Sequence, residues 1–390
     1  MQRLKQKLES LALATWYSNH WLARCSAILL LPLSWLYCAA LKYRQPDTST
    51  YRVAPSHRTG PLVIVIGNIA TGGTGKTPLL IALATQLKAR GFKPAVISRG
   101  HGGGYLKAAA QATLVGSNSD PSWVGDEPVL IARQLGTVPV VVCPKRQQAL
   151  EYLTDQIDCD IVLSDDGLQH YGLQRHIEIA LVDASRGFGN GMLLPSGPLR
   201  EPLQRLQQVD IVIANGQPEA ALKAEITTWN PNFYCAATAF SGLRQLPSLH
   251  TLSNTPDATL TTDQTTAVET LQAYRQLHIV TGIGNPQRFL NSVKSLLGDV
   301  SAASKPEMQL HAFPDHYQFT AADLQLSGAL ATNATSAIVM TAKDAVKCDA
   351  LAKQVATPVY VIDIDMLLGE SLQSAIESLL NNEPGAGIVI

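Results

Sequence analysis

The chain has 390 residues, of which 46% are apolar and 16% are charged, and its 30 Lys and Arg residues against 31 Asp and Glu give a net charge of −1. This composition excludes wholesale disorder, which requires low hydrophobicity and high net charge. It also argues against a protein that wraps nucleic acid over its whole surface, which requires a basic excess. The length predicts about two or three domains.

The charge is distributed unevenly. Residues 1–45 hold six basic side chains and one acidic side chain, so this segment carries +5 and the other 345 residues carry −6. The charged residues of the segment are Arg3, Lys5, Lys7, Glu9, Arg24, Lys42 and Arg44. The basic segment is also the most apolar part of the chain, which points to a membrane surface.

Residues 25–41 are 17 consecutive uncharged positions, CSAILLLPLSWLYCAAL. As a helix they would span about 26 Å, the lower limit for crossing a bilayer, and Pro32 predicts a kink in the middle. Aromatic residues of the interfacial type surround them: Trp16, Tyr17, Trp21, Trp35, Tyr37 and Tyr43.

Four interpretations of this segment compete. A signal peptide would need a small-residue cleavage site, and none is clear. The others are a single spanning helix, a helix lying in the membrane interface, and a buried helix of the globular body. The marginal length, the proline and the basic and aromatic flanks favour membrane contact, in particular the interfacial helix.

Residues 44–60, with Pro46, Pro55 and Gly60, predict a linker. Short apolar runs then alternate with helical patterns, which is typical of a parallel sheet covered by helices. The expected strands are Leu62–Ile66, Ala95–Ser98, Val138–Val142, Ile161–Ser164, Ile179–Val182 and Ile211–Ala214. The expected helices are Thr77–Arg90, Glu127–Gln134 and Lys145–Gln156.

A polar, Thr-rich region at residues 241–268 predicts a loop or an interdomain connection. A second β/α block follows it. Its expected strands are Leu277–Val280, Ala337–Met340 and Val359–Ile362.

The six cysteines form no Cys-x-x-Cys pair and no metal-ligand spacing. They predict scattered buried thiols in a reducing compartment and no structural zinc site. They are Cys25, Cys38, Cys143, Cys159, Cys235 and Cys348.

A glycine-rich turn follows the first expected strand and opens a helix, which resembles a P-loop. The predicted nucleotide-binding residues are Thr71, Gly72, Gly73, Thr74, Gly75, Lys76 and Thr77. Backbone N–H groups and the helix N-terminus bind phosphate oxygens, Lys76 reaches the β- and γ-phosphates, and the Thr77 hydroxyl ligates Mg²⁺. Ala70 replaces the first glycine of the pattern, and a glycine turn without a ligand is the alternative.

The run Asp160–Gly167 is an apolar strand that ends in acids, as a Mg²⁺-organising carboxylate requires. Asp165 stands at the end of this strand and Asp166 adjoins it. One of the two is expected to bind the metal and the other to orient a ligand, and the pattern does not decide which.

Phosphoryl transfer to an alcohol benefits from a base, and the candidates are Asp126 and His316. From the residues alone, the simpler interpretations are a helix N-cap for Asp126 and a surface-loop histidine for His316.

Several blocks together resemble the tetraacyldisaccharide 4′-kinases, the lipid A 4′-kinases of Gram-negative bacteria. They run in family order over most of the chain: Gly67-Asn68 with Gly72–Pro78, Ser98–Gly103, Gly125–Pro128, Asp165–His170, Arg186–Gly191, Leu194–Glu201, Gly282–Phe289, Phe313–His316 and Met340–Lys347. Two positions depart from the family pattern, His101 where Tyr is commoner and Ala342 where Glu is commoner.

The resemblance implies transfer of the γ-phosphate of ATP, with Mg²⁺, to the 4′-hydroxyl of tetraacyldisaccharide 1-phosphate, giving lipid IVA. It implies an Asp–His base assembly that maps onto Asp126 and His316, with Lys76 as the third catalytic residue. It also implies an enzyme at the cytoplasmic face of the inner membrane, peripheral or held by one N-terminal helix. The expected partners are the anionic glycolipid and the membrane surface, with no nucleic acid and no obligate protein partner.

We therefore expect a membrane-associated helical segment at 1–45, a P-loop kinase domain with a mainly parallel sheet at 46–225, and a second, smaller α/β domain at 226–390. Arg99, Gln169, His170 and Arg200 are lesser candidates for contacts with phosphates or sugar hydroxyls. The alternative function is a membrane-associated P-loop ATPase or GTPase, a switch or assembly factor without a lipid acceptor.

Overall fold

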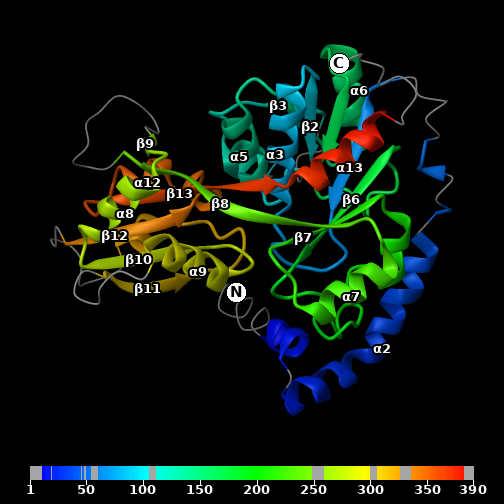
Figure 1. Cartoon of the computed structure of the whole chain (residues 1–390), viewed down its shortest axis with the longest axis horizontal. Coiled ribbons are helices and arrows are strands. Elements are labelled where there is room, and N and C mark those ends of the chain that lie inside the picture. Colours follow the sequence, from blue (N-terminus) through cyan, green and yellow to red (C-terminus); the bar gives the residue numbers. More distant parts are fainter. Residues whose placement is uncertain are drawn as a thin grey trace.

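The computed structural model describes residues 11–18, 20–44, 46–47, 50–53, 60–104, 111–247, 259–298, 305–325 and 335–381 (Figure 1). The N-terminal charges Arg3, Lys5, Lys7 and Glu9 lie outside these ranges. So do parts of the predicted linker and of the Thr-rich region.

The first lobe is an α/β layer structure built around β1. Its strands are β1 (Leu62–Gly67), β2 (Pro94–Ser98), β3 (Thr113–Val115), β4 (Val140–Val142), β5 (Ile161–Ser164), β6 (Ile177–Asp183) and β7 (Ile211–Asn215). Its helices are α3 (Lys76–Ala89), α4 (Pro121–Val124), α5 (Asp126–Leu135), α6 (Arg146–Gln156), a 3₁₀ helix (Leu203–Gln208) and α7 (Ala220–Trp229). All the strands and helices expected here are present, with ends shifted by one or two residues.

The second lobe repeats the layered plan on a smaller scale. Its strands are β9 (Thr259–Thr261), β10 (Gln276–Thr281), β11 (Glu307–Ala312) and β12 (Ser336–Thr341). Its helices are α8 (Gln264–Gln272), α9 (Pro286–Leu297), α10 (Ala321–Gln325), α11 (Ala342–Ala345) and α12 (Asp349–Ala352). The sequence patterns missed β11, whose side chains are largely exposed or half-buried and lack an apolar run.

Two long strands, β8 (Phe233–Gln245) and β13 (Val359–Leu368), join the lobes into one sheet (Figure 1). Within the described residues the sheet has 13 strands in the order β11-β10-β12-β13-β8-β7-β6-β1-β5-β2-β4-β3, with β9 beside β8. The pairs β3–β4, β8–β13 and β8–β9 are antiparallel, and the others are parallel. The mainly parallel α/β fold is thus confirmed.

The Thr-rich region is not the continuous loop that its composition predicts. Residues 241–245 belong to β8, and residues 264–268 begin α8, whose N-cap is the Asp263 side chain accepting from Thr266 N. Local composition misled the prediction because residues 241–245 (SGLRQ) lack an apolar run, and tertiary pairing with β13 makes them a strand.

The core lies on both faces of the sheet. On β1, Ile64 and Ile66 pack with α3 and α5, whereas Val63 and Val65 pack with α6 and its neighbours. Burial on both faces explains why β1 is an unbroken apolar run rather than an alternating one. The last helix, α13 (Glu370–Asn381), returns from β13 to pack in the same core as α3.

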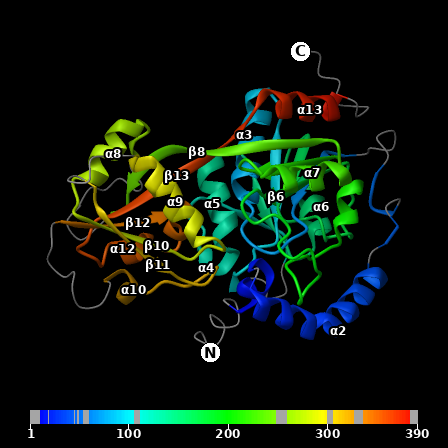
Figure 2. The ribbon, with the colours of Figure 1, turned by 60° about the horizontal axis from the view of Figure 1, so that its bottom comes forward.

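Helix α2 (Trp21–Arg44) lies along the outside of the first lobe, and it continues past Pro32 as one helix (Figure 2). Ser34 Oγ donates to Leu193 O (3.0 Å), and Tyr37 OH donates to Arg200 O (2.9 Å). Among the described residues α2 is the one helix long and apolar enough to cross a membrane. Only 11% of its apolar stretch is buried within the protein. The interpretation as a buried core helix is therefore wrong.

The outward surface of α2 is apolar. Its exposed large side chains are Trp21, Leu22, Ile28, Leu29, Leu33, Trp35, Leu36 and Tyr43. A monomeric soluble surface rarely carries so many large apolar groups together, so this face marks a docking or membrane surface.

Two smaller predictions need correction. In the described part of the linker, Tyr51 is buried and residues 51–53 pair with Arg175, so this part is fastened to the first lobe. Of the cysteines, Cys143 and Cys348 are buried, but Cys25 is exposed on α2 and the other three are half-buried. Among the described residues no group of three or more His, Cys, Asp and Glu side chains is placed to hold a metal ion.

Candidate nucleotide and phosphoryl-transfer site

The glycine-rich turn connects β1 to α3, so it lies at the carboxyl end of the central strand. Gly75 has φ +96°, and a Cβ there would lie 2.1 Å from Asn215 Nδ2. Asn215, at the end of β7, donates from the same nitrogen to Thr74 O at 2.8 Å. Only glycine fits at this position, and it allows the loop to curl so that α3 begins at Lys76 with its first N–H groups free.

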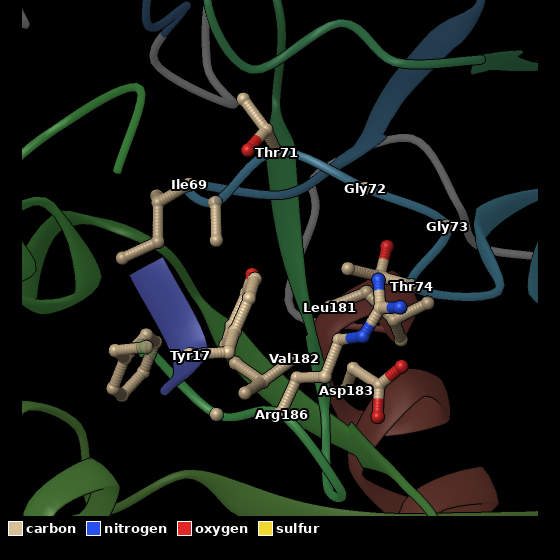
Figure 3. Close-up of a pocket in the computed structure, with 13 residues that line it drawn as sticks. Tyr17, Ile69, Thr71, Gly72, Gly73, Thr74, Leu181, Val182, Asp183 and Arg186 are labelled. Atoms are coloured by element: carbon tan, nitrogen blue, oxygen red, sulfur yellow. The ribbon is translucent and has the colours of Figure 1, made fainter. Parts of the chain in front are cut away.

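Arg186 supports the turn from below, where Figure 3 shows its guanidinium directed toward Gly72, Gly73 and Thr74. A Cβ on Gly72 would lie 3.5 Å from Arg186 Nη1. The guanidinium also lies 5.4 Å from the centre of the Tyr17 ring and donates to Gly284 O of the second lobe at 2.9 Å. One side chain thus contacts the N-terminal segment, the P-loop and the second lobe.

Lys76 faces a carboxylate that is already surrounded by cations. Its Nζ lies 3.6 Å from Asp166 Oδ1 and donates to Asn68 Oδ1 at 3.3 Å. Arg200 Nη1 donates to Asp166 Oδ1 and to Asn68 Oδ1, both at 3.0 Å. Burial alone would raise the pKa of Asp166, but Lys76 and Arg200 outweigh it and hold the pKa well below its usual range.

Asp165 differs from Asp166 in that no cationic side chain in the described part of the chain pairs with its carboxylate, and its pKa is raised rather than lowered. Its Oδ2 accepts from Ser98 Oγ at 3.2 Å, while its buried Oδ1 has no hydrogen-bond partner among the described residues. Burial, followed by the carboxylates of Glu127 and Asp166, raises the pKa of Asp165 to about 7. A buried carboxylate with an unused oxygen and too much negative charge nearby is suited to a divalent cation.

Asp126 and His316 come together across the two lobes. His316 Nδ1 lies 3.0 Å from Asp126 Oδ1 and 3.1 Å from Oδ2. Asp126 is the first residue of α5, where Gly125 is the N-cap, and His316 follows β11 in the second lobe. The N-cap interpretation of Asp126 is therefore wrong. His316 does lie in a loop, but its side chain is half-buried and paired with Asp126.

The pair is electrostatically matched. Burial opposes ionisation of Asp126, but the hydrogen bond with His316 and the charges of Lys343 and Lys347 hold the pKa of Asp126 well below its usual range. Burial also opposes protonation of His316, but the hydrogen bond with Asp126 outweighs it and raises the pKa of His316. Each partner favours the charged form of the other.

Asp166 (φ 45°) and His316 (φ 59°) are the non-glycine residues with positive φ in the described part of the chain. Such backbone is strained for these side chains and persists only where the surroundings hold it. Both lie in the same cleft, which makes this cleft the candidate functional site.

The cleft has a volume of about 680 Å³ and is lined by both lobes. The P-loop lobe contributes residues 71–77, the two acids and Glu127, and the second lobe contributes Gly284, His316 and Lys343. The lobes approach closely at two glycines, where a Cβ on Gly284 would lie 2.9 Å from Gly73 N.

One wall of the cleft is basic. It contains Arg44, Arg99, Arg146, His170 and Arg200. Burial and then the arginines lower the pKa of His170 to about 4, so this imidazole is neutral in a strongly positive environment. Of the lesser candidates, Gln169 is occupied in the fold, because its Nε2 donates to Asn68 O (2.9 Å) and Glu201 Oε2 (2.7 Å).

The sequence patterns missed Arg146, Asn215 and Arg186 as site residues. Arg146 is buried and donates from Nη2 to Asp165 O at 2.7 Å, directly behind the two acids. A usable signal exists for Arg146 and Asn215, because both stand at or just after the carboxyl end of a parallel strand, where ligands bind in such sheets.

The fold and the site define a class. A strand–turn–helix P-loop with Lys76 and Thr77, a buried acid after a neighbouring strand and a carboxylate–imidazole pair whose imidazole lines the same cleft are the parts of a P-loop phosphotransferase.

Comparison with known proteins gives the family. A family model described as Tetraacyldisaccharide-1-P 4′-kinase matches residues 26–381. A tetraacyldisaccharide 4′-kinase of Nitrosococcus oceani is 40% identical over 373 residues, covering 95% of this chain and 94% of the relative. One of Hahella chejuensis is 38% identical over 358 residues, covering 90% and 92%. The chain belongs to the tetraacyldisaccharide-1-P 4′-kinase family.

A solved structure has the same fold. The crystal structure of LpxK from Aquifex aeolicus in complex with ATP superposes with a TM-score of 0.62 and 21% sequence identity. The match covers 90% of this chain and 99% of that chain, so the two-lobed architecture is shared along its length.

Proposed function

We propose that this chain transfers the γ-phosphate of ATP to the 4′-hydroxyl of tetraacyldisaccharide 1-phosphate and so forms lipid IVA in lipid A biosynthesis. The observation that carries the proposal is the Asp126–His316 pair, whose imidazole lines the same cleft as Lys76 while Asp126 is buried behind it. A nucleotide switch needs no such pair, whereas transfer to an alcohol uses one to remove the hydroxyl proton.

In this proposal the P-loop residues Thr71, Gly72, Gly73, Thr74, Gly75, Lys76 and Thr77 hold the phosphates of ATP. Lys76, at the start of α3, reaches the β- and γ-phosphates together with the helix N-terminus. Asp166 acts by positioning, because Lys76 and Arg200 already occupy its carboxylate.

Asp165 and Thr77 are the residues proposed to hold Mg²⁺, and the unused Asp165 Oδ1 supports that assignment. The ion would neutralise charge that develops on the β- and γ-phosphate oxygens. Asp166 is the weaker ligand candidate of the two acids, since its oxygens are paired with cations.

The acceptor is activated by the pair. Asp126 receives the Nδ1–H of His316 and so leaves Nε2 as the proton acceptor. The 4′-hydroxyl gives its proton to Nε2 while its oxygen forms a bond to the γ-phosphorus and the bond from that phosphorus to the bridging oxygen breaks, releasing ADP.

The substrate is anionic and acylated, and two surfaces suit it. The basic wall, including Arg99, Arg146 and Arg200, attracts a phosphorylated sugar. The apolar face of α2 suits the interface of the membrane that holds the acyl chains, and we place the enzyme at the cytoplasmic face of the inner membrane.

The test follows γ-labelled ATP with and without the lipid disaccharide 1-phosphate. We expect label in the lipid, and none in an analogue whose 4′-hydroxyl is methylated. Release of free phosphate at the same rate with and without lipid would instead identify a nucleotide-hydrolysing switch.

A further inference from the structure

Two lysines of the second lobe cross the cleft to acids of the first. Lys343 Nζ lies 2.9 Å from Glu127 Oε1 and 3.2 Å from Asp315 Oδ1. Lys347 Nζ lies 3.6 Å from Asp126 Oδ2 and 3.2 Å from Asp344 Oδ1. Adjacent acids at the start of α5 thus meet lysines one helical turn apart, in and just after α11.

Lys343 also contacts the imidazole of the dyad. Its Nζ lies 3.5 Å from His316 Nε2, the nitrogen that faces away from Asp126. Asp315 Oδ1 lies 3.9 Å from the same nitrogen, and the His101 ring is edge-on to the His316 ring with centroids 5.1 Å apart. His316 is therefore held between Asp126 of one lobe and Lys343 of its own.

The short helix α11, which carries Lys343, is held in place by side-chain hydrogen bonds. Thr341 caps α11 by accepting from Asp344 N at 3.1 Å, and the buried Asp344 carboxylate accepts from Thr281 Oγ1 (3.0 Å) and Gly282 N (3.1 Å). These bonds tie α11 to the end of β10. The backbone of Lys343 is consequently held in place, and its side chain reaches across the cleft from this position.

We propose that Lys343 is a positioning residue for the phosphoryl transfer: by joining Glu127 of the first lobe to Asp315 of the second, it holds His316 against Asp126 and beside the cleft. The proposal rests on the role proposed above for the Asp126–His316 pair. It makes completion of the dyad depend on closure of the two lobes, because Asp126 and Glu127 belong to the first lobe whereas Asp315, His316 and Lys343 belong to the second.

The charge on Lys343 favours a role in holding the two lobes together. Burial opposes the charge on Lys343, but Glu127 and then Asp315 outweigh it and raise the pKa of Lys343, so the ammonium stays charged. A half-buried ammonium that lost either acid would be left partly uncompensated, which is unfavourable. The pairing therefore penalises any arrangement in which the lobes separate.

The experiment compares four variants in the full chain: Lys343→Met, Lys343→Arg, Glu127→Gln and the double Lys343→Met/Glu127→Gln. Lys343→Met should lower kcat about 100-fold, the cost of a misplaced catalytic group, with KM for ATP unchanged within about threefold. Lys343→Arg should recover most of that loss. The double variant should lose no more than Lys343→Met alone, because paired groups are not additive. Lys353→Met, at an exposed lysine of the same lobe, is the matched control.

A second measurement separates positioning from mere folding. The charged and titratable groups facing His316 are Asp126, Asp315, Lys343 and His101, with Glu127 and Lys347 behind them. Removing the Lys343 cation favours protonated His316, so the acid limb of the kcat profile should move to higher pH in Lys343→Met. If this variant does not fold, the same pH profile is measured with Lys343→Gln, which also removes the cation.

A kcat for Lys343→Met close to that of Lys353→Met, or an additive double variant, overturns the proposal. So does an acid limb that stays where it is. Asp126→Asn and His316→Gln are measured alongside: if these also retain full kcat, the dyad itself is wrong, and if they lose it while Lys343→Met does not, only the role of Lys343 fails.

Discussion

The two lobes contribute to the cleft in different ways. The first lobe holds its polar groups in a connected set: Lys76, Asn68, Asp166 and Arg200 contact one another within a single α/β layer. The second lobe contributes His316 and Lys343 from a loop and a short helix, and their partners Asp126 and Glu127 are in the first lobe.

The difference indicates a division of labour. The groups proposed to hold the phosphates of ATP lie on the P-loop of the first lobe. The groups proposed to activate the acceptor meet only across the cleft. Under the proposed function, this arrangement limits proton abstraction to the closed form and so limits wasteful transfer to water.

The largest effect on this comparison of the two lobes is expected from a change at Lys76. Lys76→Ala should lower the rate of lipid phosphorylation about 10³-fold or more, because it removes the charge that stabilises the transferring phosphoryl group. The assay is label transfer from ATP to the lipid disaccharide. Lys88→Ala, an exposed lysine on the same helix, is the control, and equal rates in both variants would refute the P-loop assignment.

The two-lobe dyad is tested next. Asp126→Asn and His316→Gln should each lower kcat about 10²- to 10⁴-fold, the range for a lost general base, while ATP binding changes little. Nucleotide affinity is measured separately by titration. A collapse of ATP affinity in either variant would show that the dyad belongs to the nucleotide site instead.

The pH dependence of kcat is a second test of the Asp126–His316 pair. His316 accepts a proton only as the neutral imidazole, and its pKa is raised above the ordinary value of about 6.5 by Asp126. The kcat should therefore fall as the pH falls through that raised pKa, about tenfold per unit well below it. In Asp126→Asn the limb of the residual activity should move to lower pH, and a limb that does not move would contradict the pairing.

Helix α2 offers a comparison between its own two faces. Leu29→Asp, on the exposed face, should reduce binding to vesicles containing anionic lipid without changing the melting temperature. Sedimentation with vesicles measures this. Unchanged binding would mean that the outward face of α2 is not the membrane contact.

The smallest effect is expected on the inward face. Tyr37→Phe removes the hydrogen bond to Arg200 O and should lower the free energy of unfolding by about 1 kcal/mol, with vesicle binding retained. Denaturant titration measures the loss. A larger fall in vesicle binding than in stability would place Tyr37 at the membrane rather than at the protein contact.

Much of the first lobe could be predicted because its signals are local. Apolar runs buried on both faces gave the strands, and the glycine turn before Lys76 gave the loop. The separate roles of Asp165 and Asp166 could not be predicted, because they depend on Arg200 and Ser98, which come from distant parts of the chain.

The second lobe was harder for a physical reason. Residues 241–245, the last of β8, open a polar region of the sequence yet are a strand, because β13 pairs with β8 along most of its length. The meeting of Asp126 with His316 joins residues 190 positions apart, and it was reached through family resemblance rather than spacing. Lys343 was noticed only as part of a motif, since its partners Glu127 and Asp315 lie on different lobes.

The return of α13 to the first lobe has a consequence for cooperativity. Leu372, Ile376 and Leu380 lie in the same buried cluster as Leu79 and Leu83 of α3, the helix that follows the P-loop. In topological terms the second lobe is an insertion between α7 and α13, two helices that pack on the first lobe. A fragment ending near residue 225 would leave the face of α3 uncovered, so the two lobes should unfold in one transition rather than as separable parts.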